Sequence, residues 1–348
     1  MRPFPGPLLL VGAVLLAAPS VGAYPIPPVT LWQLTAEADL IVVARVDAVE
    51  SLPDSEERDA FEGDVARLHV LEVWRGSIDS EVSVTFGKNV ICPAPPRYIP
   101  GETVLAFLES GASRLASLEK DTPADDVREL TAQWTNRWFT VGLSYGTLYP
   151  EAGDRPFLRD LVEDALALQA QSPLPESEQR AWHVRAAARR VTRWHGLYAL
   201  DRRTDEVLSF YDRKPMRPKI PTADERREVM RGFIQEPSDD HTVAMTLVFV
   251  GAQPEPEFDR AVLGQAERLL AEEDIPYWLG DALARVAERY GSRNGRRDLG
   301  LKDDWEEPNA RALRRAWGQA RERYGIPQVP PAPAPPPEVR GVAGLTPD

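Results

Sequence analysis

The sequence predicts an α+β protein of several domains, in which a five-stranded antiparallel β-barrel of the OB-like type precedes an α-helical domain. The first part of the chain carries five short runs rich in Val, Leu and aromatic residues, with turn residues between them. The second part carries helical stripes separated by prolines. The expected boundaries are 1–23 for a signal peptide, 24–150 for the barrel, 151–326 for the helices and 327–348 for a Pro-rich tail that is disordered or extended.

The first 23 residues have the pattern of a cleavable signal peptide. Arg2 is followed by an apolar run from Leu8 to Ala18, and small residues at 21–23 suit cleavage between Ala23 and Tyr24. The apolar run is too short to cross a bilayer, and no later run is long enough. We therefore expect a secreted or periplasmic protein with no membrane span after cleavage.

The barrel prediction depends on the strand-like runs and on the turns that separate them. The runs are Leu40–Val49, Val65–Trp74, Glu81–Phe86, Thr103–Leu108 and Arg137–Leu143, after a helical turn at Leu31–Ala38. The third run alternates most clearly, since Val82, Val84 and Phe86 fall on one face. Closing such strands into a barrel hides the sheet edges that otherwise invite aggregation.

The helical domain is predicted from apolar stripes and capping residues. Asp154 is expected to cap a first helix, a second runs from Glu176 to about Leu208 with a break near Gly196, and Thr222–Glu225 forms a capping box. The remaining predicted helices are a run from a Ser238 cap to Val250, then Glu257–Ala271, Pro276–Tyr290 and Glu307–Tyr324.

Two of the predicted helices end alike, in Glu288–Gly291 and in Glu322–Gly325, with the same four residues 34 positions apart. This repeated sequence is compatible with two arrangements of the helices, a short HEAT-type solenoid and an irregular helical bundle.

Charge and cysteine content narrow the class of function. The net charge is −13, so there is no basic surplus for a nucleic-acid partner. Cys92 is the only cysteine, which excludes an intramolecular disulfide. Its apolar neighbours favour a small buried hydrophobe over a reactive thiol. We expect no cofactor.

Part of the barrel region resembles the netrin-like OB-fold domains of exported proteins, whose best-known members are the tissue inhibitors of metalloproteinases. The residues that carry the resemblance are Ala38–Val46, Val70–Gly76, Cys92–Pro93 and Tyr98–Leu108. The resemblance implies an OB fold and an exported setting for residues 24–150. In the animal inhibitors a mature N-terminal cysteine binds the protease zinc, whereas this predicted mature chain begins at Tyr24, so that mechanism does not carry over.

Three patterns are candidates for catalytic or metal-binding sites. Gly142–Gly146 matches the G-x-S-x-G pattern of serine hydrolases around Ser144, but Pro150 and Gly153 prevent the helix that this chemistry needs. The histidines do not have metal-ligand spacing, and the acids of Asp239–His241 suit a helix start. The four histidines are His69, His183, His195 and His241.

The two remaining candidates are surfaces. Five tryptophans of the helical part could line a groove but are more typical of a core: Trp182, Trp194, Trp278, Trp305 and Trp317. In the barrel, the loop from Cys92 to Gly101 offers Cys92, Arg97 and Tyr98 as weak binding candidates.

These patterns favour an exported, non-enzymatic binding or interaction protein, with a partner protein or an envelope or extracellular ligand. The alternatives are a serine hydrolase that uses Ser144, and a metalloprotease-inhibitor-like module that lacks the N-terminal cysteine.

Overall fold

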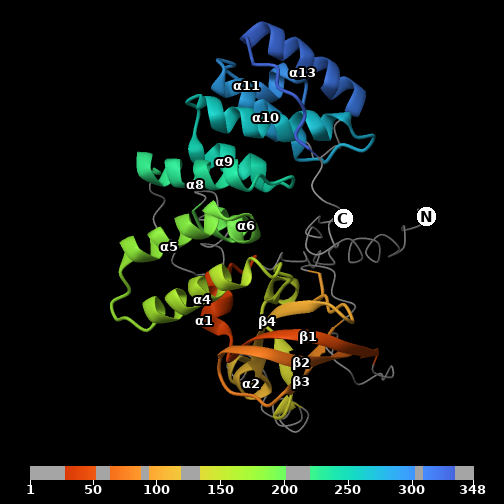
Figure 1. The fold of residues 1–348 in the computed structure, drawn as a ribbon, viewed down its shortest axis with the longest axis vertical. Coiled ribbons are helices and arrows are strands. Elements are labelled where there is room, and N and C mark those ends of the chain that lie inside the picture. The colour runs from red at the N-terminus through yellow and green to blue at the C-terminus, as the bar shows by residue number, and fades with distance from the viewer. Residues whose placement is uncertain are drawn as a thin grey trace, which may run out of the picture.

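The structure is a computed structural model that describes residues 28–51, 63–87, 94–118, 134–200, 220–301 and 309–333. A β-barrel forms one end of the molecule and a stack of helices extends away from it (Figure 1). The predicted order of a barrel followed by a helical half is thereby confirmed. The predicted signal peptide lies outside the described residues.

The barrel is a closed ring of five strands in the order β1-β2-β3-β5-β4, and β4 returns to pair with β1. All neighbours are antiparallel except β3 and β5, which run parallel. The expected all-antiparallel barrel is therefore wrong at this one seam. The strands are β1 (Leu40–Ser51), β2 (Asp64–Arg75), β3 (Glu81–Phe86), β4 (Thr103–Ser110) and β5 (Trp138–Thr140), and the short β6 (Thr147–Leu148) adds to β4.

Two strands of the ring are buried on both faces. In β1, Leu40 and Val42 point into the barrel, whereas Ile41 and Val43 point outward and are equally inaccessible to solvent. A strand that is covered on both sides needs a continuous apolar run, and Leu40–Ala44 is such a run. In β3 one face is buried throughout and the other is exposed except at Thr85, which matches its alternating sequence. The double burial marks where the rest of the chain docks on the barrel.

The outward faces of β1 and β4 are covered by helices α1 (Leu31–Glu37) and α4 (Arg155–Gln169). Leu31 and Leu34 of α1 have no exposed surface, and neither do Leu158 and Leu161 of α4. As predicted, α4 begins after Asp154, but the Asp154 side chain forms no capping hydrogen bond. Its apolar stripe packs into the barrel-side core, so the helical half supplies one wall of that core.

The remaining helices stack in layers along the long axis of the molecule (Figure 1). Each layer contacts mainly the layers next to it in the chain, as in a short solenoid. The helices are α5 (Glu176–Ala188), α6 (Arg193–Leu200), α8 (Ala223–Gln235), α9 (Thr242–Val250), α10 (Pro256–Ala271), α11 (Leu279–Arg289), α12 (Gly295–Asp298) and α13 (Ala310–Tyr324); α2 (Gly111–Leu118) belongs to the barrel. No helix within these described ranges is long and apolar enough to cross a membrane.

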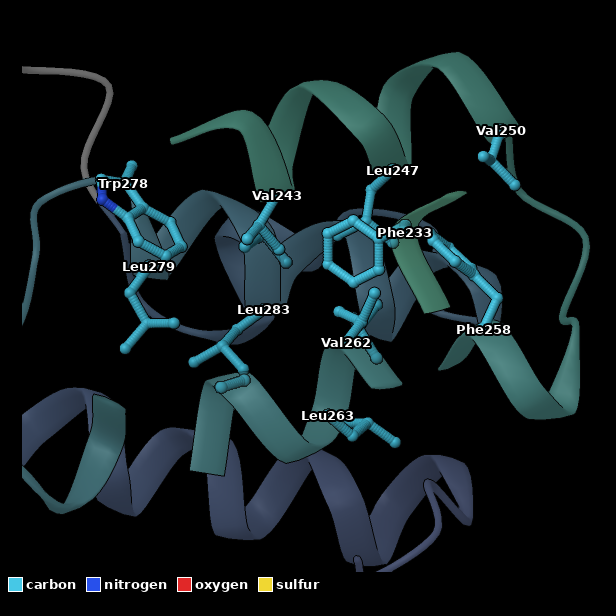
Figure 2. Close-up of a cluster of buried hydrophobic side chains, with 14 of the residues drawn as sticks. Phe233, Val243, Leu247, Val250, Phe258, Val262, Leu263, Trp278, Leu279 and Leu283 are labelled. Atoms are coloured by element: carbon cyan, nitrogen blue, oxygen red, sulfur yellow. The ribbon is translucent and has the colours of Figure 1, made fainter. Parts of the chain in front are cut away.

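One apolar core runs through the helical stack. Figure 2 shows Phe233 of α8, Leu247 of α9, Val262 of α10 and Leu283 of α11 converging on it. The run that ends at Val250 is helical, as predicted, and it is the most continuously apolar segment of the stack because neighbours cover most of its circumference.

The repeated helix ends that suggested a solenoid differ in their surroundings. Arg289 is buried and pairs with buried Asp259 at 2.8 Å. Its counterpart Arg323 is mostly exposed and lies 3.8 Å from Asp298. The layers therefore share an order of stacking but not a repeated set of contacts.

The break in the second predicted helix lies at Arg189–Thr192, not near Gly196. Gly196 sits inside α6, where a Cβ atom would come within 2.3 Å of the Ala187 nitrogen and 2.4 Å of the His183 carbonyl oxygen. The glycine permits α6 to cross α5 in direct backbone contact. The predicted helix break near Gly196 is therefore wrong, because this glycine serves the close approach of two helices and does not end one.

Ser238 does not cap α9, which begins at Thr242. Its hydroxyl instead accepts a hydrogen bond from the guanidinium of buried Arg193. The capping box at Thr222–Glu225, in contrast, is present at the start of α8, where Thr222 Oγ1 accepts from the Glu225 N–H at 3.2 Å.

The crossing at Gly196 leads to a stability prediction. Gly196→Ala should lower the free energy of unfolding by several kcal/mol, about the size of an overpacked core site, because the new methyl group meets backbone atoms that cannot yield. Gly318 of α13 is the matched control, since nothing lies within 4 Å of its would-be Cβ. Gly318→Ala should raise stability by about 0.5–1 kcal/mol through helix propensity. Urea denaturation of both variants measures the difference, and similar effects at the two positions would contradict the close crossing.

Candidate functional site

The loop proposed as a contact surface is only partly available for binding. Cys92 lies outside the described residues. Arg97 is exposed, but Tyr98 is buried and shares a 2.8 Å hydrogen bond with Thr140 Oγ1. Burial raises the pKa of Tyr98 well above its usual value. Tyr98 thus packs inside the barrel, whereas Arg97 faces solvent, as do Pro100 and Gly101 at the end of the loop.

Ser144 lies in a 3-10 turn, Leu143–Gly146, which is followed by β6 and not by a helix. Gly142 and Leu143 both have positive φ, 63° and 55°, so the backbone is strained just before the serine. Ser144 Oγ is buried and has no hydrogen-bond partner. The turn therefore lacks the helix N-terminus that stabilises an oxyanion in the serine hydrolases of this motif.

Two of the histidines lie at the contact between the barrel-side helix α1 and the helical stack. His195 Nδ1 accepts a hydrogen bond from the Leu31 N–H at 3.1 Å, which satisfies one of the free amides at the start of α1. The His183 ring contacts Trp32 and Trp182, with centroids 5.6 and 5.0 Å away. Burial lowers the pKa of His195 to about 4 and that of His183 to about 3, so both rings are neutral at pH 7.

Within the described ranges, no cluster of three or more His, Cys, Asp or Glu side chains could hold a metal ion. Asp240 accepts from the Thr242 N–H at 2.9 Å at the start of α9, and Asp239 pairs with Arg268 at 3.4 Å. These acids therefore stabilise the fold locally. Trp182, Trp278 and Trp317 are buried, as the core interpretation predicts, Trp194 is partly buried, and Trp305 lies outside the described residues.

A cavity with a volume of about 680 Å³ lies where the chain passes from the barrel into the helical stack. We call it the junction groove. It is lined by residues from the segment after β6, the α5–α6 link, the α8–α9 loop, α10 and the end of the described chain. These are Glu151, Asp154, Arg190, Val191, Glu236, Pro237, Asp239, Arg260, Ala261, Gly264, Gln265 and Pro330–Pro333.

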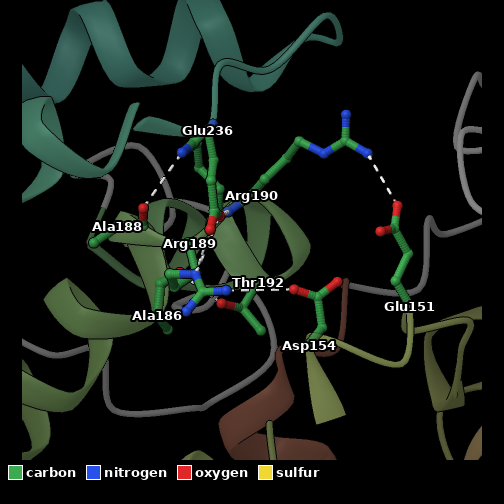
Figure 3. A network of polar contacts seen from close by, with 9 residues as sticks. Glu151, Asp154, Ala186, Ala188, Arg189, Arg190, Thr192 and Glu236 are labelled. Carbon is green, nitrogen blue, oxygen red and sulfur yellow. Dashed lines mark hydrogen bonds and ion pairs between the residues drawn. The ribbon is translucent and has the colours of Figure 1, made fainter. Parts of the chain in front are cut away.

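A network of charges organises one side of the groove (Figure 3). Arg189 bonds Glu236 at 2.9 Å and lies 3.4 Å from Asp154, while the Arg190 N–H donates to Glu236 at 3.0 Å. Burial raises the pKa of Asp154, and the Arg189 guanidinium opposes this effect. The network ties the C-terminus of α8 to the α5–α6 link and to the start of α4, so the groove wall has a defined shape.

Beneath this network, Arg193 is completely buried. Its guanidinium donates to the Ala187 and Ala188 carbonyls at 3.3 Å each, to Ser238, and lies 4.9 Å above the Phe233 ring. Burial lowers its pKa to about 10, so it stays charged at neutral pH. A buried cation that is satisfied by carbonyls fixes the relative positions of α5, α6 and α8 under the groove.

The opposite side of the groove is formed by the chain itself. Residues 327–333, which we call the strap, leave the end of α13 and run over α10, where the Ala332 N–H donates to the Gly264 carbonyl at 2.8 Å. Gly264 has no side chain, and its would-be Cβ lies 3.6 Å from the Ala332 Cβ. Val329 packs against the helical core. One wall of the groove is therefore a proline-rich segment of the chain that lies against α10.

Sequence reasoning missed this groove. Its charged residues are ordinary in type and lie far apart in the chain, and Arg189 and Glu236 are paired across 47 positions. The one available signal was the Pro-rich tail, which was interpreted as disordered or extended.

Comparisons with protein-family models, with curated proteins and with solved structures find no match for this chain. The netrin-like resemblance of the barrel therefore remains an interpretation of the sequence. The groove has to be judged from its own geometry.

The buried histidines predict a loss of stability in mild acid. An unfolded histidine has a pKa of about 6.5, whereas folded His195 has a pKa of about 4. The stabilisation is thus complete above about pH 6.5 and is lost as the pH falls toward 4, at roughly 1.4 kcal/mol per pH unit for each such histidine.

The measurement is urea denaturation between pH 7 and pH 5 for the wild type and for His195→Asn, whose side-chain oxygen can still accept the Leu31 N–H. The variant should show a shallower dependence of stability on pH. Identical slopes in the two proteins would contradict the assignment to His195.

Proposed function

We propose that the protein is an exported, non-enzymatic binding protein, and that the junction groove binds an extended segment of a partner protein. The observation that carries this proposal is the strap, a proline-rich segment that lies against α10 at the edge of the groove and is held there by a backbone hydrogen bond. Recognition of extended segments commonly combines one or a few main-chain hydrogen bonds with apolar contacts. The export part rests on the signal-peptide pattern of residues 1–23.

The walls of the groove suit binding because they are fixed in advance. Asp154 and Glu236 are held by Arg189, and Asp239 is held by Arg268 at 3.4 Å. Side chains that are already ordered lose little entropy when a ligand arrives. Proline-rich ligands also lose little conformational entropy on binding, since their backbone is already restricted in the free state.

A peptide of the chain's own sequence tests the groove. In the full chain, Ala332→Pro removes the one N–H that bonds Gly264, which should free the groove for a ligand in trans. A labelled peptide of residues 328–336 should bind this variant with a dissociation constant in roughly the high-micromolar to millimolar range, given the small contact. It should bind the wild type at least several-fold more weakly. Fluorescence anisotropy measures both.

The control is a variant that fills the groove. Gly264→Leu in the Ala332→Pro background places a side chain where Ala332 now lies, so peptide binding should be lost while the far-ultraviolet circular dichroism stays the same. Equal binding with and without Gly264→Leu would show that the peptide does not use the groove.

The serine-hydrolase alternative has a separate test. Purified wild type and Ser144→Ala are compared on p-nitrophenyl acetate and butyrate. We expect equal, background rates, because Ser144 Oγ is buried and bonds no base. A rate that depends on Ser144 would overturn the non-enzymatic proposal.

A further inference from the structure

The strap offers the groove very few backbone donors. Pro330, Pro331 and Pro333 have no N–H, so Ala332 carries the only N–H among these four residues, and that N–H bonds the Gly264 carbonyl. A ligand that replaces the strap must therefore present at least one non-proline residue at this position. Prolines on either side keep the ligand extended, with about 3.1 Å of length per residue.

Every carboxylate that lines the groove has an arginine partner, whereas one lining arginine has no carboxylate partner among the described residues. The carboxylates lie near these arginines: Asp154 and Glu236 near Arg189, Asp239 near Arg268, and Glu151 near Arg190 at 4.0 Å. Arg260 also lines the groove, is exposed, and forms no ion pair or hydrogen bond across the described ranges. Four carboxylates and two arginines line the groove, and Arg260 is the one of these charged residues for which no ion pair is formed within the described part of the chain.

Arg260 is placed to act on a bound segment. It precedes Gly264 by four residues on α10, so the two lie on the same helix face about one turn apart, roughly 6 Å. Two residues of an extended proline-type chain cover about the same distance. In a ligand that runs along α10, a side chain two positions from the residue that bonds Gly264 would therefore reach Arg260. The strap has Pro330 at one such position, which cannot pair with a guanidinium.

We infer that the ligand of the junction groove is an extended, proline-containing protein segment with a carboxylate side chain that pairs with Arg260. The inference rests on the proposed function of the groove. The strap occupies the same position without an acid, and a partner with Asp or Glu displaces it by an interaction that the strap does not form.

The experiment uses the full chain with Ala332→Pro and peptides of residues 328–336. Glu replaces Pro330 in one peptide and Ala334 in another, and Gln replaces the same residues in two matched peptides. One of the two Glu peptides should bind about two- to fivefold more tightly than its Gln partner, the usual range for an exposed ion pair. The preference should shrink as salt is raised.

Variants of Arg260 test whether this residue causes the preference for Glu peptides over Gln peptides. Arg260→Gln should bind the Glu and Gln peptides equally, and Arg260→Glu should prefer a Lys peptide of the same register. Circular dichroism of each variant confirms that the exposed substitution leaves the fold intact.

Equal binding of the Glu and Gln peptides to the chain with Arg260, or a Glu preference that survives Arg260→Gln, would overturn the inference and leave the groove proposal standing. If neither these peptides nor the unsubstituted one binds, the proposed function of the groove fails as well.

Discussion

The apolar contact between α1 and its two neighbours is the constraint on which the rest of the structure depends. Leu31 and Leu34 fill the space between the outer face of the barrel and helix α4, with no exposed surface. The start of α1 is anchored from the helical stack, because His195 accepts the Leu31 N–H. Barrel and helices are therefore packed together through a shared core. The groove lies next to this contact, since Glu151 and Asp154 line it just before α4 begins.

Burial explains how much of the barrel the sequence could predict. Strands β1 and β4 are covered on both faces and therefore read as continuous apolar runs, whereas β3 is covered on one face and alternates. These patterns identify strands but do not indicate which strands pair with each other. The parallel pairing of β3 with β5 brings together Val84 and Trp138, which are far apart in the chain, so the expectation of an antiparallel barrel failed there.

In the helical half and the candidate site, too, the sequence predicts local features but not contacts between distant residues. The start of α8 at Thr222 was predicted because a capping box depends on neighbouring residues. Gly196 and Ser238 were misinterpreted because each serves a distant partner, the α5 backbone for the glycine and Arg193 for the serine. The groove has no local signature, since its ion pairs join residues from separate elements that resemble ordinary surface charges.

The way the strap is held determines what a partner must supply. Its described polar anchor is one hydrogen bond, and such a bond contributes only about 0.5–1.5 kcal/mol. The strap is nevertheless tethered directly to α13, and short tethers give effective concentrations of about a millimolar. A free segment with the same contacts would therefore compete poorly. A partner needs contacts that the strap lacks, and Arg260, which is exposed and forms no ion pair within the described residues, offers such a contact.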